Sequence, residues 1–195
     1  MTRLRAAILV LAVGLAVPLV WACVIAAAEV VDIPGTIVTA PFQITSLQPD
    51  GMIRRRSDGA ITGDNIYNLD GSGQTRIRGV APGTTWSFAV RLENDGDVAG
   101  DIRVTAPPSS PPFTVRYLVA NFNITSKVTG GGFTFTDVAP GQIWTLGVQF
   151  NVAPDTPLES QADPLVKFTS ETAPRADAVR VGVVVKAVTA QSGSD

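Results

Sequence analysis

The sequence predicts an all-β protein, a β-sandwich of seven to nine strands, and three observations support that prediction. From about residue 37 onward, short segments alternate apolar and polar residues with the period of two that half-buried strands have. Turns rich in glycine and proline separate these segments at short intervals. The same part of the chain shows no apolar periodicity of the helical kind. Many short strands with frequent turns are typical of two packed sheets.

The clearest strand is predicted over residues 84–92, where the large apolar side chains share one face. These are Trp86, Phe88, Val90 and Leu92. Asp95 and Gly96 follow and favour a tight hairpin turn, because both residue types tolerate the backbone angles of such turns. The return strand is expected over residues 98–104, with a bulge at Gly100.

The second half of the chain continues the pattern. Residues 107–112 contain four prolines and form a connection, since proline cannot donate to a strand ladder. Further alternating strands are expected from Phe113, after the three glycines that end at Gly132, over residues 142–150, and in a final pair. The members of that pair are residues 165–170 and 178–187.

A short sequence echo precedes two of these strands. Val-Ala-Pro-Gly occurs at residues 80–83 and again at residues 138–141, and a tryptophan stands three residues beyond each glycine. Proline fixes φ and glycine permits the reversal, so each copy predicts a turn that begins a buried strand. Trp86 and Trp144 are therefore expected in the core. We expect two similar turn–strand units, one in each sheet.

Residues 1–28 have the features of an export signal in the form of an N-terminal helix. Arg3 and Arg5 precede an apolar run, Pro18 interrupts it, and residues 26–28 are alanines that suit a cleavage site. Two alternatives stay open. Residues 6–28 are long and apolar enough for a retained membrane anchor, and Cys23 is the residue that lipidation would use. In each case the folded part is predicted to lie outside the cytoplasm.

The expected organisation of the whole chain has four parts. They are the signal or anchor helix over 1–28, a linker with an edge strand over 29–47, the β-sandwich over 48–188, and a polar tail over 189–195.

Composition excludes several classes of function. The chain has no histidine, the commonest general base and metal ligand, and its one cysteine lies in the N-terminal segment. Triads that need histidine or cysteine are excluded, as are disulfides and thiolate zinc sites. Without Arg3 and Arg5, the 15 basic residues become 13 against 17 acidic ones, a net charge of −4. This balance argues against nucleic acid as a partner.

Several motifs resemble a module of exported bacterial proteins. They are GDNIYN at residues 63–68, GSGQT at residues 71–75 and NDG at residues 94–96. Over residues 48–188 the pattern is similar to the immunoglobulin-like accessory domains of secreted glycosidases and surface proteins. The resemblance implies an immunoglobulin-like sandwich with an extracellular accessory or structural role, and it carries over no catalytic residue. The sequence is expected to form a single module, without the enzyme or the tandem repeats that usually accompany such modules.

One loop is a candidate metal site. Asp64, Asn65, Asn68 and Asp70 place oxygen ligands in a segment bounded by glycines, and calcium is bound by six to eight such oxygens. The alternative is a loop of Asx turns that satisfies its own backbone. Calcium is the one cofactor that the sequence suggests.

Other polar or aromatic residues have simpler explanations. The acidic residues around Asp95 fit a solvated hairpin tip, although calcium is an alternative there too. The arginines at residues 54–56 fit a charged strand edge that discourages strand addition. Tyr67 and Phe122 fall out of phase with the buried faces, which makes them better candidates for a binding surface than the tryptophans.

The sequence therefore predicts a non-catalytic, exported cell-surface or extracellular protein with a structural or interaction role. The alternative is a carbohydrate-binding β-sandwich module, which would need an exposed aromatic row on one sheet face. Expected partners are a cell-surface protein or a polysaccharide, with self-assembly through edge strands as a further option. A membrane contact is expected only through residues 6–28, if that segment is retained.

Overall fold

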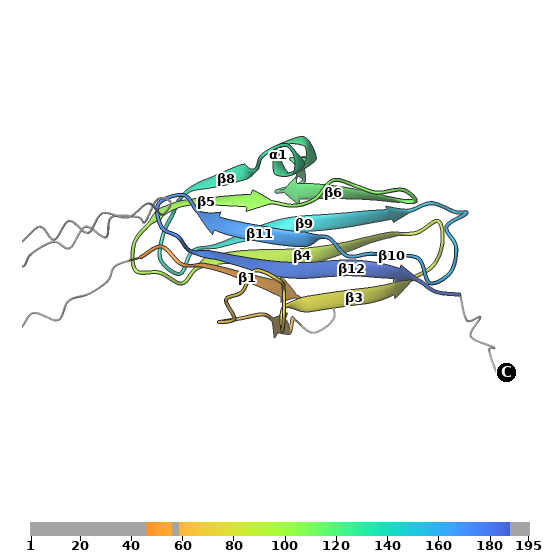
Figure 1. The fold of residues 1–195 in the computed structure, drawn as a ribbon, viewed down its shortest axis with the longest axis horizontal. Helices are drawn as coiled ribbons and strands as arrows, with labels where there is room; N and C mark the ends of the chain where they lie inside the picture. Colours follow the sequence, from red (N-terminus) through yellow and green to blue (C-terminus); the bar gives the residue numbers. More distant parts are fainter. Residues whose placement is uncertain (1–45, 56–58, 188–195) are drawn as a thin grey trace, which may run out of the picture. The chain divides into compact units, whose positions relative to one another are not determined.

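The computed structural model describes residues 46–55 and 59–187, which fall within one compact unit that spans Gln43–Asp195. The predicted signal, most of the predicted linker and the polar tail lie outside the described residues. In the described part, twelve strands form two sheets, and one short helix joins two of the strands (Figure 1). That part contains no helix long and apolar enough to cross a membrane.

The first sheet contains six antiparallel strands. In spatial order they are β2 (Ile61–Thr62), β1 (Pro49–Arg54), β4 (Thr85–Asn94), β9 (Ile143–Val152), β6 (Phe113–Val119) and β7 (Phe122–Asn123). The ten-residue strands β4 and β9 form its centre.

The second sheet is built around β12 (Ala176–Val185). On one side of it β3 (Thr75–Val80) pairs in parallel, and on the other side β10 (Gln161–Ala162) and β11 (Leu165–Ser170) pair antiparallel. Beyond β11 lie β5 (Gly100–Thr105) and the edge strand β8 (Phe133–Val138). Helix α1 (Thr125–Thr129) connects β7 to β8. Three of the twelve described strands have only two residues. The other nine agree with the upper end of the predicted range of seven to nine strands.

Both sheets turn a row of apolar side chains toward each other. Phe88, Val90 and Leu92 of β4 are buried on the face that the alternation predicted. The inward row of β12 is Val179, Val181, Val183 and Val185, each fully buried. Burying a valine, leucine or phenylalanine contributes roughly 1.5–3 kcal/mol, so these rows hold the sheets together. An all-β sandwich is confirmed.

The predicted hairpin at Asp95 and Gly96 is wrong. Strand β5 does not return beside β4 but crosses to the second sheet, where it pairs with β11 and β8. The reason lies in Asn94, whose side-chain amide donates to the carbonyls of Val98 and Val138, both at 2.8 Å. Its Oδ1 accepts the N–H of Gly96 at 2.9 Å. The buried Asn94 side chain thus stabilises a crossover instead of a hairpin.

Two other local predictions are confirmed, and one is corrected. The β5–β8 register shifts between Gly100 and Ile102, where the bulge was expected, and β11 pairs with β12 as a hairpin. The two Ala-Pro-Gly turns, however, do not begin strands in different sheets. Both precede central strands of the first sheet, β4 and β9, which pair with each other and bring Trp86 opposite Phe150 and Trp144 opposite Leu92.

Candidate functional site

The loop over residues 63–74, between β2 and β3, contains the predicted metal ligands, and the buried carboxylate of Asp177 anchors it. One oxygen of Asp177 accepts the N–H of Gly51 in β1 at 2.6 Å. The other accepts the N–H of Asn68 at 3.0 Å and Nε2 of Gln74 at 2.7 Å. Asp177 therefore ties together β1, the loop and the residue before β3. Three N–H donors thus meet in this one buried carboxylate.

Asp50 of β1 is equally buried but much less satisfied. Its Oδ2 accepts the N–H of Asn65 at 3.1 Å, and its Oδ1 has no hydrogen-bond partner. Burial raises the pKa of Asp50 from 3.8 to about 7. That pKa includes the Asn65 hydrogen bond, which lowers it, and the negative charges of Asp95, Asp177 and Asp64, which contribute to the rise.

Gln74 completes a buried cluster, which we define as Asp50, Gln74 and Asp177. Its Nε2 donates to the carbonyl of Ile66 at 2.8 Å as well as to Asp177, and its Oε1 has no partner. Gly63 borders this oxygen closely. A Cβ at Gly63 would lie 3.0 Å from both Oε1 of Gln74 and the carbonyl oxygen of Gly51. Two oxygens thus face the space that a side chain at residue 63 would fill.

The four predicted ligands are divided between this cluster and the outer loop. Oδ1 of Asn68 accepts the N–H of Gly71 at 2.7 Å, and Asp70 accepts the N–H and the hydroxyl of Ser72. These bonds lower the pKa of Asp70 and follow the Asx-turn alternative. The backbone N–H of Asn65 donates to Asp50, and the negative charge of Asp64 contributes to the raised pKa of Asp50. The calcium prediction for the four residues stays a prediction.

Sequence reasoning missed Asp50, Gln74 and Asp177. Gln74 and Asp177 are 103 residues apart, and only the pairing of β3 with β12 brings them together. Gln74 belongs to the GSGQT motif, which was the one local signal for it. The described residues contain no group of three or more histidine, cysteine or acidic side chains placed to hold a metal. A cation at this cluster would therefore need amide and backbone oxygens as well.

The second acidic segment, residues 93–97, is largely structural. Asp95 accepts the hydroxyl of Tyr67 at 2.6 Å, and Asp97 accepts the N–H of Ser46 at 2.8 Å. Burial, followed by the charges of Asp95 and Asp64, raises the pKa of Glu93 above its ordinary value. These contacts fix the loop and the start of the described chain against the β4–β5 crossover.

The tryptophans lie on the predicted face but at different depths. Trp86 is half-buried against the core, whereas Trp144 is 36% exposed and packs on Phe135, with ring centroids 5.4 Å apart. The core prediction for Trp144 is wrong, because the first three residues of β9 are all exposed and its buried positions begin only at Leu146. Tyr67 and Phe122 are exposed as predicted, but Tyr67 lies in the loop after β2 and Phe122 lies in β7, and β2 and β7 are the opposite edges of the first sheet. They form no single aromatic row.

A basic hollow opens where β3 of the second sheet lies near β1 and β4 of the first. We call it the arginine pocket and define it by Arg54, Arg76, Arg78 and Trp86, which line a hollow of about 230 Å³. Arg76 and Arg78 fall on the same side of β3 as the buried Val80. The guanidinium of Arg78 lies 4.8 Å from the centroid of the Trp86 ring.

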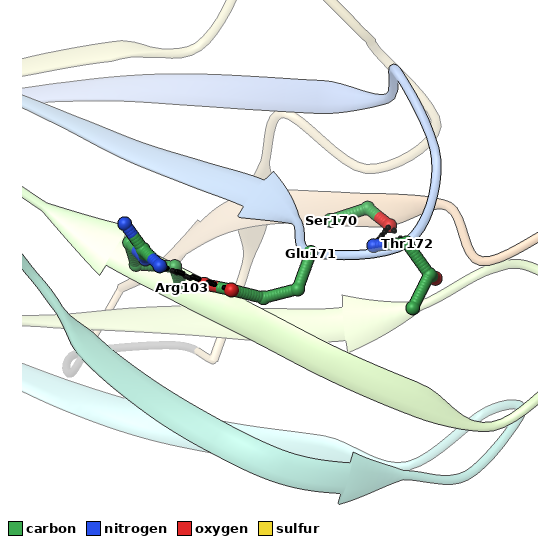
Figure 2. Close-up of polar contacts among 4 residues, drawn as sticks. All are labelled: Arg103, Ser170, Glu171 and Thr172. Carbon is green, nitrogen blue, oxygen red and sulfur yellow. Dashed lines mark hydrogen bonds and ion pairs between the residues drawn. The ribbon is translucent and has the colours of Figure 1, made fainter.

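Two arginines of the second sheet, Arg103 and Arg180, have acidic partners. Arg103 of β5 forms a two-pronged ion pair with Glu171, next to the turn in which Ser170 accepts the N–H of Thr172 (Figure 2). Arg180 pairs with Asp163 at 3.6 Å. Within residues 46–55 and 59–187, by contrast, neither Arg54 nor Arg76 nor Arg78 forms an ion pair. The arginine pocket thus gathers uncompensated positive charge on an acidic chain.

No family model matches the chain, and no curated protein matches it. Solved structures that match include a family 123 glycoside hydrolase from Clostridium perfringens, with 7% identity over 57% of this chain and 22% of that one, at a TM-score of 0.39. This chain therefore spans less than a quarter of that enzyme.

Two further matches are bacterial. The major pilin subunit BcpA of Bacillus cereus is 13% identical over 71% of this chain and 40% of its own, with a TM-score of 0.39. A type I cohesin of ScaB from Pseudobacteroides cellulosolvens is 8% identical over 62% and 97%, with a TM-score of 0.37. At these TM-scores the matches assign no function to this chain.

Proposed function

We propose that the chain is an exported, non-catalytic β-sandwich that acts at the cell surface or in the extracellular space as an interaction module. The observation that carries this proposal is the arginine pocket, which presents three unpaired guanidinium groups to solvent. Unpaired arginines in a hollow suit a partner that carries carboxylate or phosphate groups.

The position of these arginines supports a binding role. Arg76 and Arg78 occupy inward positions of β3, where a closed sandwich would place apolar side chains. Stacking on Trp86 uses the face of the Arg78 guanidinium and leaves its N–H donors, which lie in the plane of the group, free for a ligand. The indole thus holds a cation in place for an anionic partner.

The contacts of the acidic side chains support a non-catalytic role. Here Asp177 accepts three N–H donors that hold a loop, and Asp95 accepts the hydroxyl of Tyr67. Each of these acids connects segments of the fold instead of facing a second acid across a cleft.

At β3, self-assembly by strand pairing is less favoured than binding of an anionic partner. This strand has a free edge, but Arg76 and Arg78 give it the charge that discourages pairing between chains. Strands β2, β7 and β10, with two residues each, offer little ladder for another chain.

The alternative function is carbohydrate binding, and Trp86 in the arginine pocket is the observation that favours it. A half-buried indole beside guanidinium groups would suit an acidic sugar better than a neutral one. The immunoglobulin-like topology, the accessory role and export through residues 1–28, with or without cleavage, belong to this proposal as expectations from the sequence.

Co-sedimentation of the full chain tests the proposal, with carboxymethyl-cellulose beads compared with plain cellulose beads. Binding to the charged beads alone, weakened at least about tenfold in the double variant Arg76→Ala/Arg78→Ala, is expected, since each guanidinium–anion contact contributes about 1.5–3 kcal/mol. The matched control is Arg116→Ala, an exposed arginine on the first sheet.

Competition with soluble polyglutamate separates the two classes of partner. If polyglutamate displaces the chain as readily as soluble carboxymethyl-cellulose, an acidic protein surface is the better partner. If only the polysaccharide competes, the carbohydrate alternative is favoured. Equal binding by the double variant, or no binding to either anionic polymer, would overturn the arginine pocket as the contact surface.

A further inference from the structure

We infer that two copies of this chain associate through one edge of the fold, with an acidic loop of each copy against the arginine pocket of the other. The acidic loop is defined by Asp64, Ile66, Leu69 and Asp70, which lie between β2 and β3. The inference rests on the proposed function, because it names a second copy of the chain as an anionic partner of the arginine pocket.

The acidic loop and the arginine pocket are neighbours along one edge of the described chain. The loop ends at Gln74, β3 begins at the next residue, and Arg76 and Arg78 follow within that strand. The loop and β3 adjoin along the lower border of the two sheets in Figure 1. A two-fold axis between neighbouring patches brings each patch of one copy against the other patch of its partner. This placement therefore suits a symmetric dimer.

The two patches carry opposite charges that are not neutralised inside the chain. Within residues 46–55 and 59–187, the three arginines of the pocket form no ion pair, and neither do the exposed Asp64 and Asp70. Pairs of arginine and carboxylate form strong, directional hydrogen bonds, and complementary charges across an interface fix its orientation. The whole chain has a net charge of −2, so repulsion between two copies is small beside these local attractions.

Both patches also expose apolar side chains. On the acidic loop, Leu69 is 57% exposed and Ile66 is 37% exposed. At the arginine pocket, Ile77 is 42% exposed between the two arginines of β3, and Trp86 is half-buried in the lining. Stable interfaces have an apolar centre and a polar, solvent-accessible rim. We therefore expect these apolar side chains at the centre of the contact, with the ion pairs around them.

The acidic loop is held in place before a partner binds. Asp177 accepts the N–H of Asn68 at 3.0 Å, and Tyr67 in the same loop donates its hydroxyl to Asp95 at 2.6 Å. A preorganised loop loses less conformational entropy on association than an unanchored one. The buried contacts that anchor the loop therefore also favour binding by its exposed side chains.

Sedimentation velocity of the full chain tests the inference, in a non-ionic detergent that keeps the apolar run at residues 6–28 from associating. A monomer–dimer equilibrium is expected at about 20 mM salt, and its Kd should rise at least about tenfold at about 500 mM salt, because salt screens exposed charges. A chain that stays monomeric up to about 0.5 mM in low salt would overturn the inference. Association that salt leaves unchanged would overturn it as well.

Two variants locate the contact. The base-reversed variant is Arg76→Glu/Arg78→Glu. The acid-reversed variant is Asp64→Lys/Asp70→Asn, in which asparagine retains an oxygen for the N–H of Ser72. Each variant alone should be monomeric, because like charges then face each other, whereas an equimolar mixture of the two should dimerise. Recovery on mixing also shows that both variants are folded. Variants that keep the Tm of the parent and stay monomeric in the mixture would overturn the pairing of these patches.

A matched control removes charge effects that are not local. The variant Arg116→Glu/Asp155→Lys changes an exposed arginine and an exposed aspartate outside both patches, and it should dimerise as the parent chain does. Loss of the dimer in this control would mean that net charge distribution, and not the two patches, drives association.

Binding to the carboxymethyl-cellulose beads separates this inference from the proposed function. The acid-reversed variant retains the arginine pocket, so it should bind the beads as the parent chain does although it no longer dimerises. A parent chain that binds the beads but stays monomeric would overturn the dimer alone. If the parent chain neither dimerises nor binds an anionic polymer, the arginine pocket is not a contact surface and both proposals fail.

Discussion

The buried cluster and the arginine pocket are neighbours along the chain, since Gln74 of the cluster is followed by Arg76 of the pocket, yet their charged groups are stabilised in opposite ways. In the buried cluster, negative groups are fully enclosed and are met mainly by N–H donors from three parts of the chain. In the arginine pocket, positive groups stand at a strand edge, without acidic partners in the described structure.

This difference separates a structural role from a binding role. A buried carboxylate with several donors organises the fold, since its loss leaves those donors unsatisfied. Exposed cations without partners add little to stability, because water already solvates them, but they remain available to a ligand. The comparison therefore predicts large stability effects at the buried cluster and small ones at the arginine pocket.

The largest effect is expected for Asp177→Ala. This change leaves the N–H groups of Gly51 and Asn68 and the Gln74 amide without their acceptor, which should lower the free energy of unfolding by about 4 kcal/mol. Urea unfolding measures it, with the exposed Asp155→Ala as control. A loss below about 1 kcal/mol would contradict the anchoring role of Asp177.

The next effect is a pH dependence set by Asp50. Its pKa is about 7 in the folded chain against 3.8 when unperturbed, so the native state holds the proton more tightly. Stability from this group is therefore complete below pH 4 and declines as pH rises toward 7, by about 4 kcal/mol in all. Urea unfolding of the parent chain and of Asp50→Asn at pH 4, 5.5 and 8 isolates it. Parallel pH profiles for the two chains would contradict this prediction.

A smaller effect on stability is expected for Arg78→Ala. Loss of the stacking on Trp86 should lower the free energy of unfolding by about 1 kcal/mol or less, while binding to the anionic beads weakens severalfold. The same preparation serves for urea unfolding and for bead binding. The comparison fails if Arg78→Ala destabilises the chain as much as Asp177→Ala does.

The smallest effect on the free energy of unfolding is expected for Asp70→Asn. The substituted amide retains one oxygen that can accept the N–H of Ser72, so the turn survives. Differential scanning calorimetry should show a shift in Tm of about 1–2 °C. A much larger shift would mean that the outer loop has a role in the cluster that its exposed hydrogen bonds do not explain.

Much of the fold was predictable because strand alternation is a local property. The face of β4 follows from Phe88, Val90 and Leu92 alone, and the bulge at Gly100 was visible as a lone glycine in a strand. The helix α1 was missed because five residues are too few to establish a period of 3.6.

The wrong predictions depend on contacts with residues that are distant in the sequence, which local patterns cannot indicate. Asp95 and Gly96 signal a reversal, but a hairpin and a crossover between sheets both need one. The outcome depended on contacts of Asn94 with Val98 and with Val138, 44 residues away. Likewise, Trp144 is in phase with the buried side chains of β9 and is nevertheless exposed, because the buried positions of that strand begin only at Leu146.

The sequence by itself determined the all-β class, the faces of the main strands, and the exclusion of histidine and cysteine chemistry, because these depend on residue type and on neighbours along the chain. Only the tertiary structure decided that Asp50, Gln74 and Asp177 share one buried cluster and that Arg54 joins Arg76 and Arg78. Both gatherings result from strand pairing and from the packing of two sheets, which bring together residues up to 127 positions apart. Burial and charge at such points are properties of the folded chain.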